Sequence, residues 1–416
     1  MDLWDHLFAQ TYDPIMVPLQ FLIIFCTFYY LFLSFFGLWK KKEKVVAPPS
    51  KQFALVVAAH NEQAVIGPLV ENLKQMDYPR ELYEIFIIAD NCTDQTAAIA
   101  REAGAEVYER FNRQQRGKGY ALEWMFEKIF RMERQFDAVV IFDADNLVKA
   151  NFLTEMNNKL MEGHQIVQCY LDSKNPFDNW VTATFSIAFW HCNRLLQLAR
   201  YNIGLSNILG GTGMCITTKL LREYGWGATS LTEDLEFSMK ALMNGIKTVW
   251  AHEAVIYDEK PLTFMQSWNQ RKRWAQGHVD IFLRYFPKLV WKGITTGDFR
   301  MLDGAMHLFQ PLLVIFVTFF MVMSYIEPFH SNYTLVFNVM NDLNVWKILS
   351  YIQLAQPLIA LMLDKVDRRS YKYVLLYPIF IYSWVPIVFL GFLHRNRREW
   401  SHTVHTRGLS YNEVVK

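Results

Sequence analysis

The first half of the chain alternates short apolar runs with longer stretches in which apolar residues recur at helical spacing. Phe53 to Ala59 is apolar throughout, as expected for a strand that is buried on both faces of a sheet. Further strands are predicted at 84–89, 106–108, 138–142 and 166–170, and helices at 61–76, 93–103, 119–130 and 151–161. Strands that alternate with helices predict an α/β fold around a parallel sheet.

The pattern is less regular in the second half of the chain. Trp180 to Ala199 is predicted to form one long apolar helix, and the glycine-rich stretch at 209–216 a bent strand or loop. A helix is predicted at 233–244 and a short strand at 248–251. Pro261 to Trp291 is predicted to be helical, with aromatic residues interleaved among Arg and Lys. That mixture is typical of a helix at a membrane surface, and an ordinary amphipathic surface helix has the same composition.

Several uncharged stretches are long enough to cross a bilayer. Pro14 to Trp39 carries no charged residue, and about 20 apolar residues suffice for a span. Lys40 to Lys44 follows it and places the next segment in the cytoplasm by the positive-inside bias. Later spans are predicted at 304–326 and 373–393, with a marginal one at 346–363. Four crossings would leave the basic tail outside, so either one late segment is re-entrant or the tail departs from the bias.

Composition supports a membrane protein, and 416 residues leave room for one large domain or two ordinary ones. The chain is 52% hydrophobic and 16% aromatic, and its net charge of +2 does not indicate a nucleic-acid partner. The five cysteines are scattered without a CxxC pair, which indicates reduced thiols rather than a disulfide frame or zinc site. The predicted organisation is an N-terminal membrane segment (1–46), a cytoplasmic domain (47–260), interface helices (261–300), C-terminal membrane helices (301–394) and a tail (395–416).

Asp143 and Asp145 give the strongest local indication of chemistry. They follow the apolar run 138–142, so they should lie at the carboxyl edge of the sheet, where open α/β folds bind ligands. Two carboxylates one residue apart repel each other unless a cation lies between them, and Mg²⁺ or Mn²⁺ can share such carboxylates with a diphosphate. A solvated acidic loop is the alternative.

Polar residues after the first two strands should lie at the same edge. Asn61 and Glu62 follow the first strand, and Asp90 and Asp94 follow the second, where they can hydrogen-bond a nucleobase or ribose. Polar loops after strands are also common in general, and Asp94 could act only on the start of its helix. Lys118 lies between two glycines and can meet a phosphate, although this sequence also suits a turn.

Two later clusters complete the candidate site. Glu233 and Asp234 begin a helix, where Asp234 can act as a general base or the acids can simply favour the helix start. Gln270 and Trp274 are four residues apart and share a helix face. Trp274 offers a flat surface to a sugar ring and Arg273 a fork to a phosphate, whereas anchoring at the membrane interface is the alternative role.

The ordered series of these motifs resembles the membrane-embedded family 2 glycosyltransferases, which include the cellulose, chitin, hyaluronan and poly-N-acetylglucosamine synthases. The resemblance covers roughly Lys51 to Asp280. It implies a GT-A type nucleotide-sugar-binding domain inserted between membrane helices and facing the cytoplasm, with Mg²⁺ or Mn²⁺ as cofactor. The reaction it implies is a single displacement that inverts an α-linked UDP-sugar donor to a β-linked product.

The resemblance also implies a role for each matching residue. At the donor, the residues expected to contact the uridine are Asp90, Asp94, Asn61 and Glu62. Those expected to contact the diphosphate are Lys118, Asp143, Gln270 and Arg273. The metal is expected to be bound by Asp145, together with Asp143. Those expected at the acceptor are Asp234 as catalytic base with Glu233 beside it, Trp274 under the acceptor sugar, and the loop Gly211-Thr212-Gly213 lining the acceptor site.

Three functions fit these expectations. The first is a processive synthase that polymerises a polysaccharide and exports it, alone, as a homo-oligomer or with accessory export subunits. The second is an enzyme that adds one sugar to a lipid acceptor at the bilayer. The third, a catalytically silent membrane scaffold, is disfavoured by the intact acids Asp143, Asp145 and Asp234. The resemblance implies a multi-pass protein of the cell membrane; only one span is expected before the domain and no regulatory domain after the last span.

Overall fold

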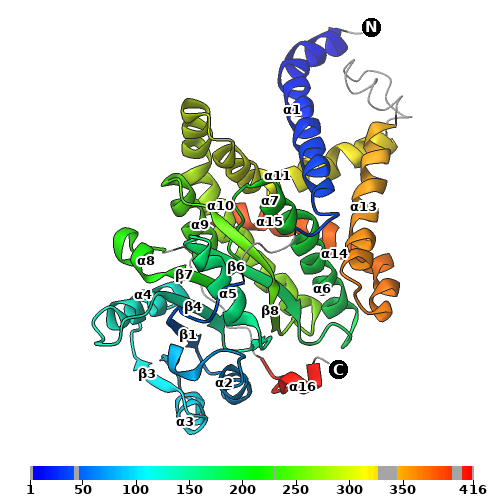
Figure 1. Ribbon diagram of the computed structural model, residues 1–416. Coiled ribbons are helices and arrows are strands. Elements are labelled where there is room, and N and C mark those ends of the chain that lie inside the picture. The colour runs from blue at the N-terminus through cyan, green and yellow to red at the C-terminus, as the bar shows by residue number, and fades with distance from the viewer. Residues whose placement is uncertain (1–2, 42–45, 229, 327–343, 396–404, 415–416) are drawn as a thin grey trace.

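The computed structural model describes residues 3–41, 46–228, 230–326, 344–395 and 405–414. Its centre is a sheet of eight strands in the order β3-β2-β1-β4-β7-β6-β8-β5 (Figure 1). The strands are β1 (Phe53–Ala59), β2 (Tyr83–Asp90), β3 (Glu106–Arg110), β4 (Ala138–Asp143), β5 (Leu147–Val148), β6 (Ile166–Ser173), β7 (Met214–Thr217) and β8 (Thr248–Asp258).

The α/β fold is confirmed, but the sheet is mixed where the alternating pattern predicted a parallel one. Strands β1 to β4 run parallel, as predicted, but β7 pairs antiparallel with β4 and β6, and β5 pairs antiparallel with β8. Met214 pairs with Ile141 near the carboxyl end of β4, so β7 starts at that edge and runs back. A run of apolar residues indicates that a strand is buried but not in which direction it runs. The antiparallel direction of β7 could therefore not be predicted from the sequence.

Helices cover both faces of the sheet and create two apolar cores. Alternate residues of β1 enter opposite cores: Leu55 packs toward α2 and α5, and Val56 toward α4, α8 and α9. This accounts for the unbroken apolar run of β1. The helices are α2 (Ile66–Lys74), α3 (Thr96–Glu102), α4 (Lys118–Ile129), α5 (Phe152–Met161), α8 (Thr218–Tyr224) and α9 (Glu233–Met243), with a 3-10 helix at Arg80–Leu82.

Two predicted helices are shorter or less regular than expected. The helix predicted at 61–76 begins only at Ile66, because Asn61 has a left-handed backbone with φ of 56° and cannot start it. The helix predicted at 180–199 consists of α6 (Trp180–Cys192), a π-helical turn (Asn193–Gln197) and α7 (Leu198–Ile203). Within that turn Arg194 donates to the carbonyls of Gly37 and Leu38, which fixes the chain that follows α1.

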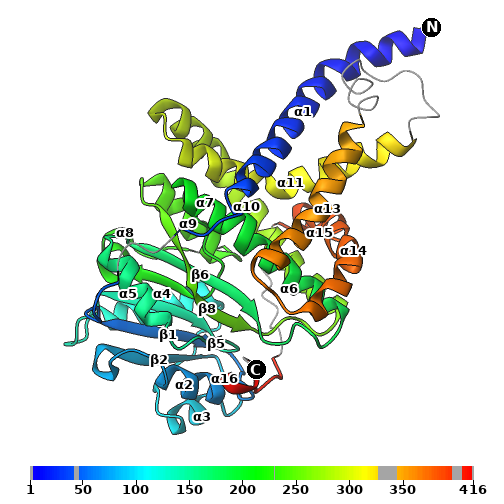
Figure 2. The ribbon, with the colours of Figure 1, turned by 45° about the vertical axis from the view of Figure 1, so that its right-hand side comes forward.

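A second group of helices gathers on one side of the sheet domain, and α1 projects away from it (Figure 2). They are α1 (Leu3–Phe35), α10 (Phe264–Thr296), α11 (Phe299–Ile326), α13 (Val345–Leu363), a 3-10 helix (Arg368–Leu376), α14 (Tyr377–Tyr382) and α15 (Trp384–Leu393). Three segments within the described residues are long and apolar enough to cross a membrane, namely Pro18–Phe35, Phe299–Val322 and Arg368–Leu393. Lys347–Leu363 is apolar but shorter, in line with its marginal predicted length.

The last predicted span is not one continuous helix. The chain breaks at Ser383 between α14 and α15, because Pro386 has no N–H to bond the carbonyl of Tyr382. Gly391 of α15 lies against Ala275 of α10, where an added Cβ would come within 2.8 Å of the Ala275 side chain. The broken segment therefore packs directly on the helix that carries the predicted Gln270, Arg273 and Trp274.

A buried ion pair joins the apolar helices to the sheet domain. Arg200 of α7 donates to Asp303 of α11 at 3.0 Å, and both side chains are about 1% exposed. Tyr29 of α1 donates to the same carboxylate at 2.7 Å. Because breaking a buried charge pair leaves an uncompensated charge, these contacts hold α1, α7 and α11 in one arrangement.

Candidate active site

The polar residues that follow β1, β2 and β4 lie at one edge of the sheet. The three strands run parallel, with Ala59 opposite Ala89 and Ala58 opposite Asp143. Their carboxyl ends therefore coincide and bring Asn61, Asp90 and Asp143 to the same side, as the sequence predicted.

Lys118 joins three parts of this edge. Its ammonium forms an ion pair with Asp143 and donates to the carbonyl of Gly211 at 2.7 Å. Burial would lower the pKa of Lys118, but the charges of Asp143, Glu233 and Asp234 outweigh it and raise the pKa above its ordinary value. Lys118 therefore stays charged among these acids and can meet the phosphates of a ligand.

The loop that precedes β7 closes over the end of β4. The Thr212 hydroxyl accepts a hydrogen bond from the Asp143 amide at 3.0 Å and donates to the Asn146 side chain. Gly211 and Gly213 have φ of 85° and 61°, in the left-handed region that favours glycine. A Cβ on Gly211 would lie 3.4 Å from a carboxylate oxygen of Asp234, so the predicted acceptor loop and the predicted base are in contact.

Glu233 and Asp234 lie side by side, partly buried, at the start of α9. Burial and the neighbouring Glu233 charge together raise the pKa of Asp234 to about 7, although the backbone amide of Leu235 and the charge of Lys118 oppose that rise. Burial also raises the pKa of Glu233, against the charge of Lys118. A carboxylate that titrates near neutral pH can accept a proton from a hydroxyl, as a general base does.

Arg273 faces the same acids from α10. Burial lowers the pKa of its guanidinium, and the charges of Glu233, Asp143 and Asp234 oppose that decrease. Its Nε and the Oε1 of Gln270 have no hydrogen-bond partner among the described residues. Buried polar groups in native proteins are normally hydrogen-bonded, so these two atoms are available to bind a polar ligand. Trp274 instead packs edge-on against Phe185, with ring centroids 5.8 Å apart, and against Phe189.

The residues predicted at the uridine are partly engaged with each other. Asp90 is buried in an ion pair with Arg110 at 2.6 Å. Asn61 accepts from the Thr93 amide at 2.8 Å. Asp94 accepts from the amide and hydroxyl of Thr96, and these bonds hold the pKa of Asp94 below its ordinary value although burial opposes them. These contacts give Asp94 a structural role at the start of α3, and its contact with a nucleotide stays a prediction.

The C-terminal tail returns to this edge, which the sequence did not indicate. His405 contacts the Glu62 carboxylate at 3.0 Å and lies 4.0 Å from Asp145. Glu259 accepts hydrogen bonds from the Thr406 and Arg407 amides, while its own amide donates to Asp145 at 2.7 Å. Burial would lower the pKa of His405, but the three surrounding acids, Asp145 foremost, raise it to about 10.

Asp145 could hold a divalent cation, because carboxylate oxygens are ligands of both Mg²⁺ and Mn²⁺. Asp145 is 5% exposed and faces the His405 ring, which the surrounding acids keep protonated and which could ligate a metal only after losing that proton. Three or more His, Cys, Asp or Glu side chains do not converge on one point within the described ranges. One or two protein ligands are enough for a cation that also binds substrate phosphates. Asp143, the other predicted ligand, is paired with Lys118.

Two comparisons place the fold. The sequence model described as "Glycosyltransferase like family 2" matches residues 48–277. A mannosyltransferase from Pyrobaculum calidifontis, solved with GDP-mannose and Mn²⁺, superposes with a TM-score of 0.60 at 18% identity, over 92% of this chain and 98% of that protein. Because only 18% of the residues are identical, the superposition shows a shared fold, the GT-A fold, and no more.

Curated relatives act on different acceptors according to their names. A beta-monoglucosyldiacylglycerol synthase from Nostoc sp. is 28% identical over 57% of this chain and 51% of its own length. A poly-beta-1,6-N-acetyl-D-glucosamine synthase from Staphylococcus aureus is 23% identical over 59% of each chain. The chain thus spans about half the length of the curated relatives it matches first. Because the family model covers more than half of the sequence, this protein belongs to the family 2 glycosyltransferases.

Proposed function

We propose that this protein transfers a sugar from a UDP-sugar to an acceptor presented at the membrane, with inversion at the anomeric carbon. The observation that carries the proposal is the partly buried Asp234, whose pKa is raised to about 7 and which lies in contact with the Gly211 loop and among Lys118 and Arg273. This arrangement supplies a base and two cations at one place. The base can accept the proton of the acceptor hydroxyl, and the cations can stabilise the negative charge of the leaving diphosphate.

Each residue then has a distinct task. Lys118, Gln270 and Arg273 hold the diphosphate, and Asp90 with Asn61 and Glu62 borders the uridine. Asp234 takes the proton of the acceptor hydroxyl as its oxygen attacks the anomeric carbon, and the bond from that carbon to the diphosphate oxygen breaks. A Mg²⁺ or Mn²⁺ ion held by Asp145, with His405 beside it, would neutralise charge on the departing nucleoside diphosphate.

The helices support a membrane location with the catalytic domain on the cytoplasmic side. Large apolar side chains such as Phe25, Phe32 and Phe389 are exposed on the candidate spans, as expected for surfaces that face lipid. Lys40 follows the first of them, which favours a cytoplasmic position for the sheet domain. A bilayer therefore lies close to the site where the acceptor must arrive.

A single transfer to a lipid is the acceptor chemistry that we favour. The described part of the chain offers three helices long enough to cross a membrane, and the last of them is broken. So small a bundle suits an acceptor that diffuses in the bilayer. A growing polysaccharide is the second candidate, because the partly exposed rings of Trp274 and Phe189, which pack around the buried Phe185, are of the kind on which sugar rings stack.

Product length separates the two acceptors. Purified full-length protein in lipid nanodiscs, incubated with radiolabelled UDP-glucose or UDP-N-acetylglucosamine and Mn²⁺, should yield a lipid that carries one labelled sugar. Thin-layer chromatography of the lipid extract and gel filtration of the aqueous fraction measure the two products. A labelled ladder in the aqueous fraction would favour the polymer, and no transfer from any UDP-sugar would contradict the proposed function.

The pH profile tests the coupling between the two acids of α9. Asp234 must be ionised to act as base, so kcat/KM should rise with pH through about 7 in the wild-type protein. Glu233→Gln removes a neighbouring negative charge that raises the pKa of Asp234. The rising limb should therefore move to lower pH, by about one unit. Glu223→Gln, at an exposed position on α8, is the control, and an unchanged limb in Glu233→Gln would contradict the coupling.

A further inference from the structure

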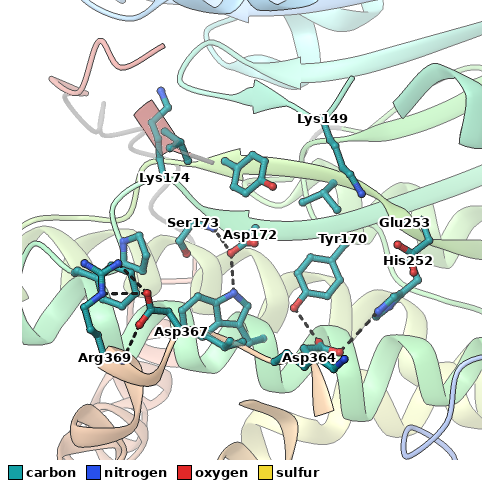
Figure 3. Close-up of a pocket in the computed structure, with 18 of the residues that line it drawn as sticks. Lys149, Tyr170, Asp172, Ser173, Lys174, His252, Glu253, Asp364, Asp367 and Arg369 are labelled. Carbon is teal, nitrogen blue, oxygen red and sulfur yellow. Dashed lines mark hydrogen bonds and ion pairs between the residues drawn. The ribbon is translucent and has the colours of Figure 1, made fainter. Parts of the chain in front are cut away.

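A polar cavity of about 650 Å³ lies beside the candidate active site, between the sheet and the segment that follows α13 (Figure 3). Its walls come from β6 and β8, from residues 364–369 and from α16 (Tyr411–Val414). The described residues that line it do not include Asp143, Asp145, Asp234 or Arg273. Its volume is within the range of small-molecule sites, and none of the tasks assigned above uses it.

Ion pairs neutralise most of the acids at this cavity but leave three amines over. Lys40 pairs with Glu253 at 3.3 Å, Arg369 with Asp367 at 2.8 Å, and Asp364 with Arg194 at 2.8 Å. No ion pair is formed among the described residues by the remaining lining amines, which are Lys149, Lys174 and Lys365. The lining also carries the acids Asp172 and Glu413, so the three amines leave one positive charge in excess, which favours an anionic ligand.

Two buried polar groups lack adequate partners. Lys174 is 5% exposed, and within the described part of the chain its ammonium has one hydrogen bond, of 3.4 Å, to the carbonyl of Arg407. The acids Asp145 and Glu259 act on its charge from nearby but form no ion pair with it among the described residues. The neighbouring Ser173 is 4% exposed, and its hydroxyl has no partner within the described part of the chain. Because burying such groups unpaired costs free energy, an oxyanion that accepts from both would stabilise this wall.

The middle of the cavity presents fixed acceptors for hydroxyl groups. Asp172 is held by the Trp190 indole at 2.7 Å, and Asp364 by the Tyr170 hydroxyl at 2.9 Å. Figure 3 shows Lys149 and Lys174 at opposite ends of the cavity, with these carboxylates between them. A ligand that satisfies the whole cavity therefore combines phosphate with several hydroxyls.

The cavity borders the chain segments nearest the candidate membrane spans. Lys40 lies shortly after the end of α1, and Lys365 lies between α13 and the segment Arg368–Leu393. This position makes the cavity accessible to a lipid headgroup as well as to a soluble molecule. We propose that it binds a phosphorylated polyol, either as the headgroup of an anionic glycerolipid or as a free glycerol or sugar phosphate.

The test measures protection of Lys149 in the full-length protein, in nanodiscs of phosphatidylcholine. The rate of Lys149 acetylation is followed by mass spectrometry, with exposed Lys219 as the internal control. Glycerol 3-phosphate, or replacement of part of the lipid by phosphatidylglycerol, should slow acetylation of Lys149 about tenfold and leave Lys219 unchanged. Lys149→Gln should weaken binding of the same ligand about tenfold in a thermal-shift titration, while Lys149→Arg and Lys219→Gln retain it.

The two arms identify the source of the ligand. Protection by phosphatidylglycerol alone would identify a lipid headgroup, and protection by glycerol 3-phosphate in phosphatidylcholine discs a free phosphate. Equal acetylation in all discs, or a Lys149→Gln variant that binds as tightly as wild type, would overturn the proposal. Because the readout is binding and not transfer, its failure is distinguishable from failure of the proposed function.

Discussion

The Asp234→Asn variant is expected to lose about a thousandfold in kcat while its affinity for UDP changes little. Asparagine keeps the shape of the side chain but cannot accept the proton of an acceptor hydroxyl. Asp234 contacts the Gly211 loop, and the cations assigned to the diphosphate, Lys118 and Arg273, are untouched by the change. The variant should therefore lose its turnover while it keeps its affinity for UDP.

Isothermal titration with UDP and a radiolabelled transfer assay measure the two effects. Asp280→Asn is the control, because Asp280 lies on α10 in a half-exposed pair with Arg284, where an ion pair contributes little. If Asp234→Asn kept most of its turnover, the base would have to be another group, with Glu233 the nearest candidate.

Removal of the divalent cation is expected to have the second large effect. EDTA should abolish transfer by the wild-type protein, and added Mn²⁺ should restore it. Asp145→Asn should lower the Mn²⁺-dependent affinity for UDP by about a hundredfold, since it removes a charged ligand at a buried position. Affinity for UDP without metal should change much less, because Lys118 and Arg273 remain.

Titrations of UDP with and without Mn²⁺ provide the measurement, and the exposed Asp77 supplies a matched Asp→Asn control. Full turnover in EDTA would remove the metal from the mechanism. An Asp145→Asn variant with wild-type response to Mn²⁺ would place the ion elsewhere, with Asp143 then the other acid of the motif to test.

The sequence predicted most of the sheet and most of the site because both depend on local patterns. The run 53–59 identified β1, and the acids after 138–142 identified the edge at which they lie. The direction of β7 escaped prediction because a four-residue strand, Met214–Thr217, of which three residues are buried, has the same apolar pattern in either orientation. The break at Ser383 was not predicted, because the stretch is otherwise apolar and only the position of Pro386 within it indicates where the helix is interrupted.

The contribution of the tail could not be predicted because it depends on contacts across the whole chain. Glu62 and His405 are separated by 343 residues, and no local pattern marks His405 among the 11 histidines. The role of Glu259 could not be predicted either. Its amide donates to Asp145 and its carboxylate accepts from the tail, and both contacts form only when these distant segments have folded together. Long-range contacts of this kind follow from topology and not from residue spacing.

The return of residues 405–414 to the catalytic edge sets an order for biogenesis. A ribosome makes this segment after α15, which packs against α10. A nascent chain would therefore leave this side of its nucleotide pocket open until helices α10 to α15 had been made. Such timing would couple completion of the pocket to synthesis of those helices.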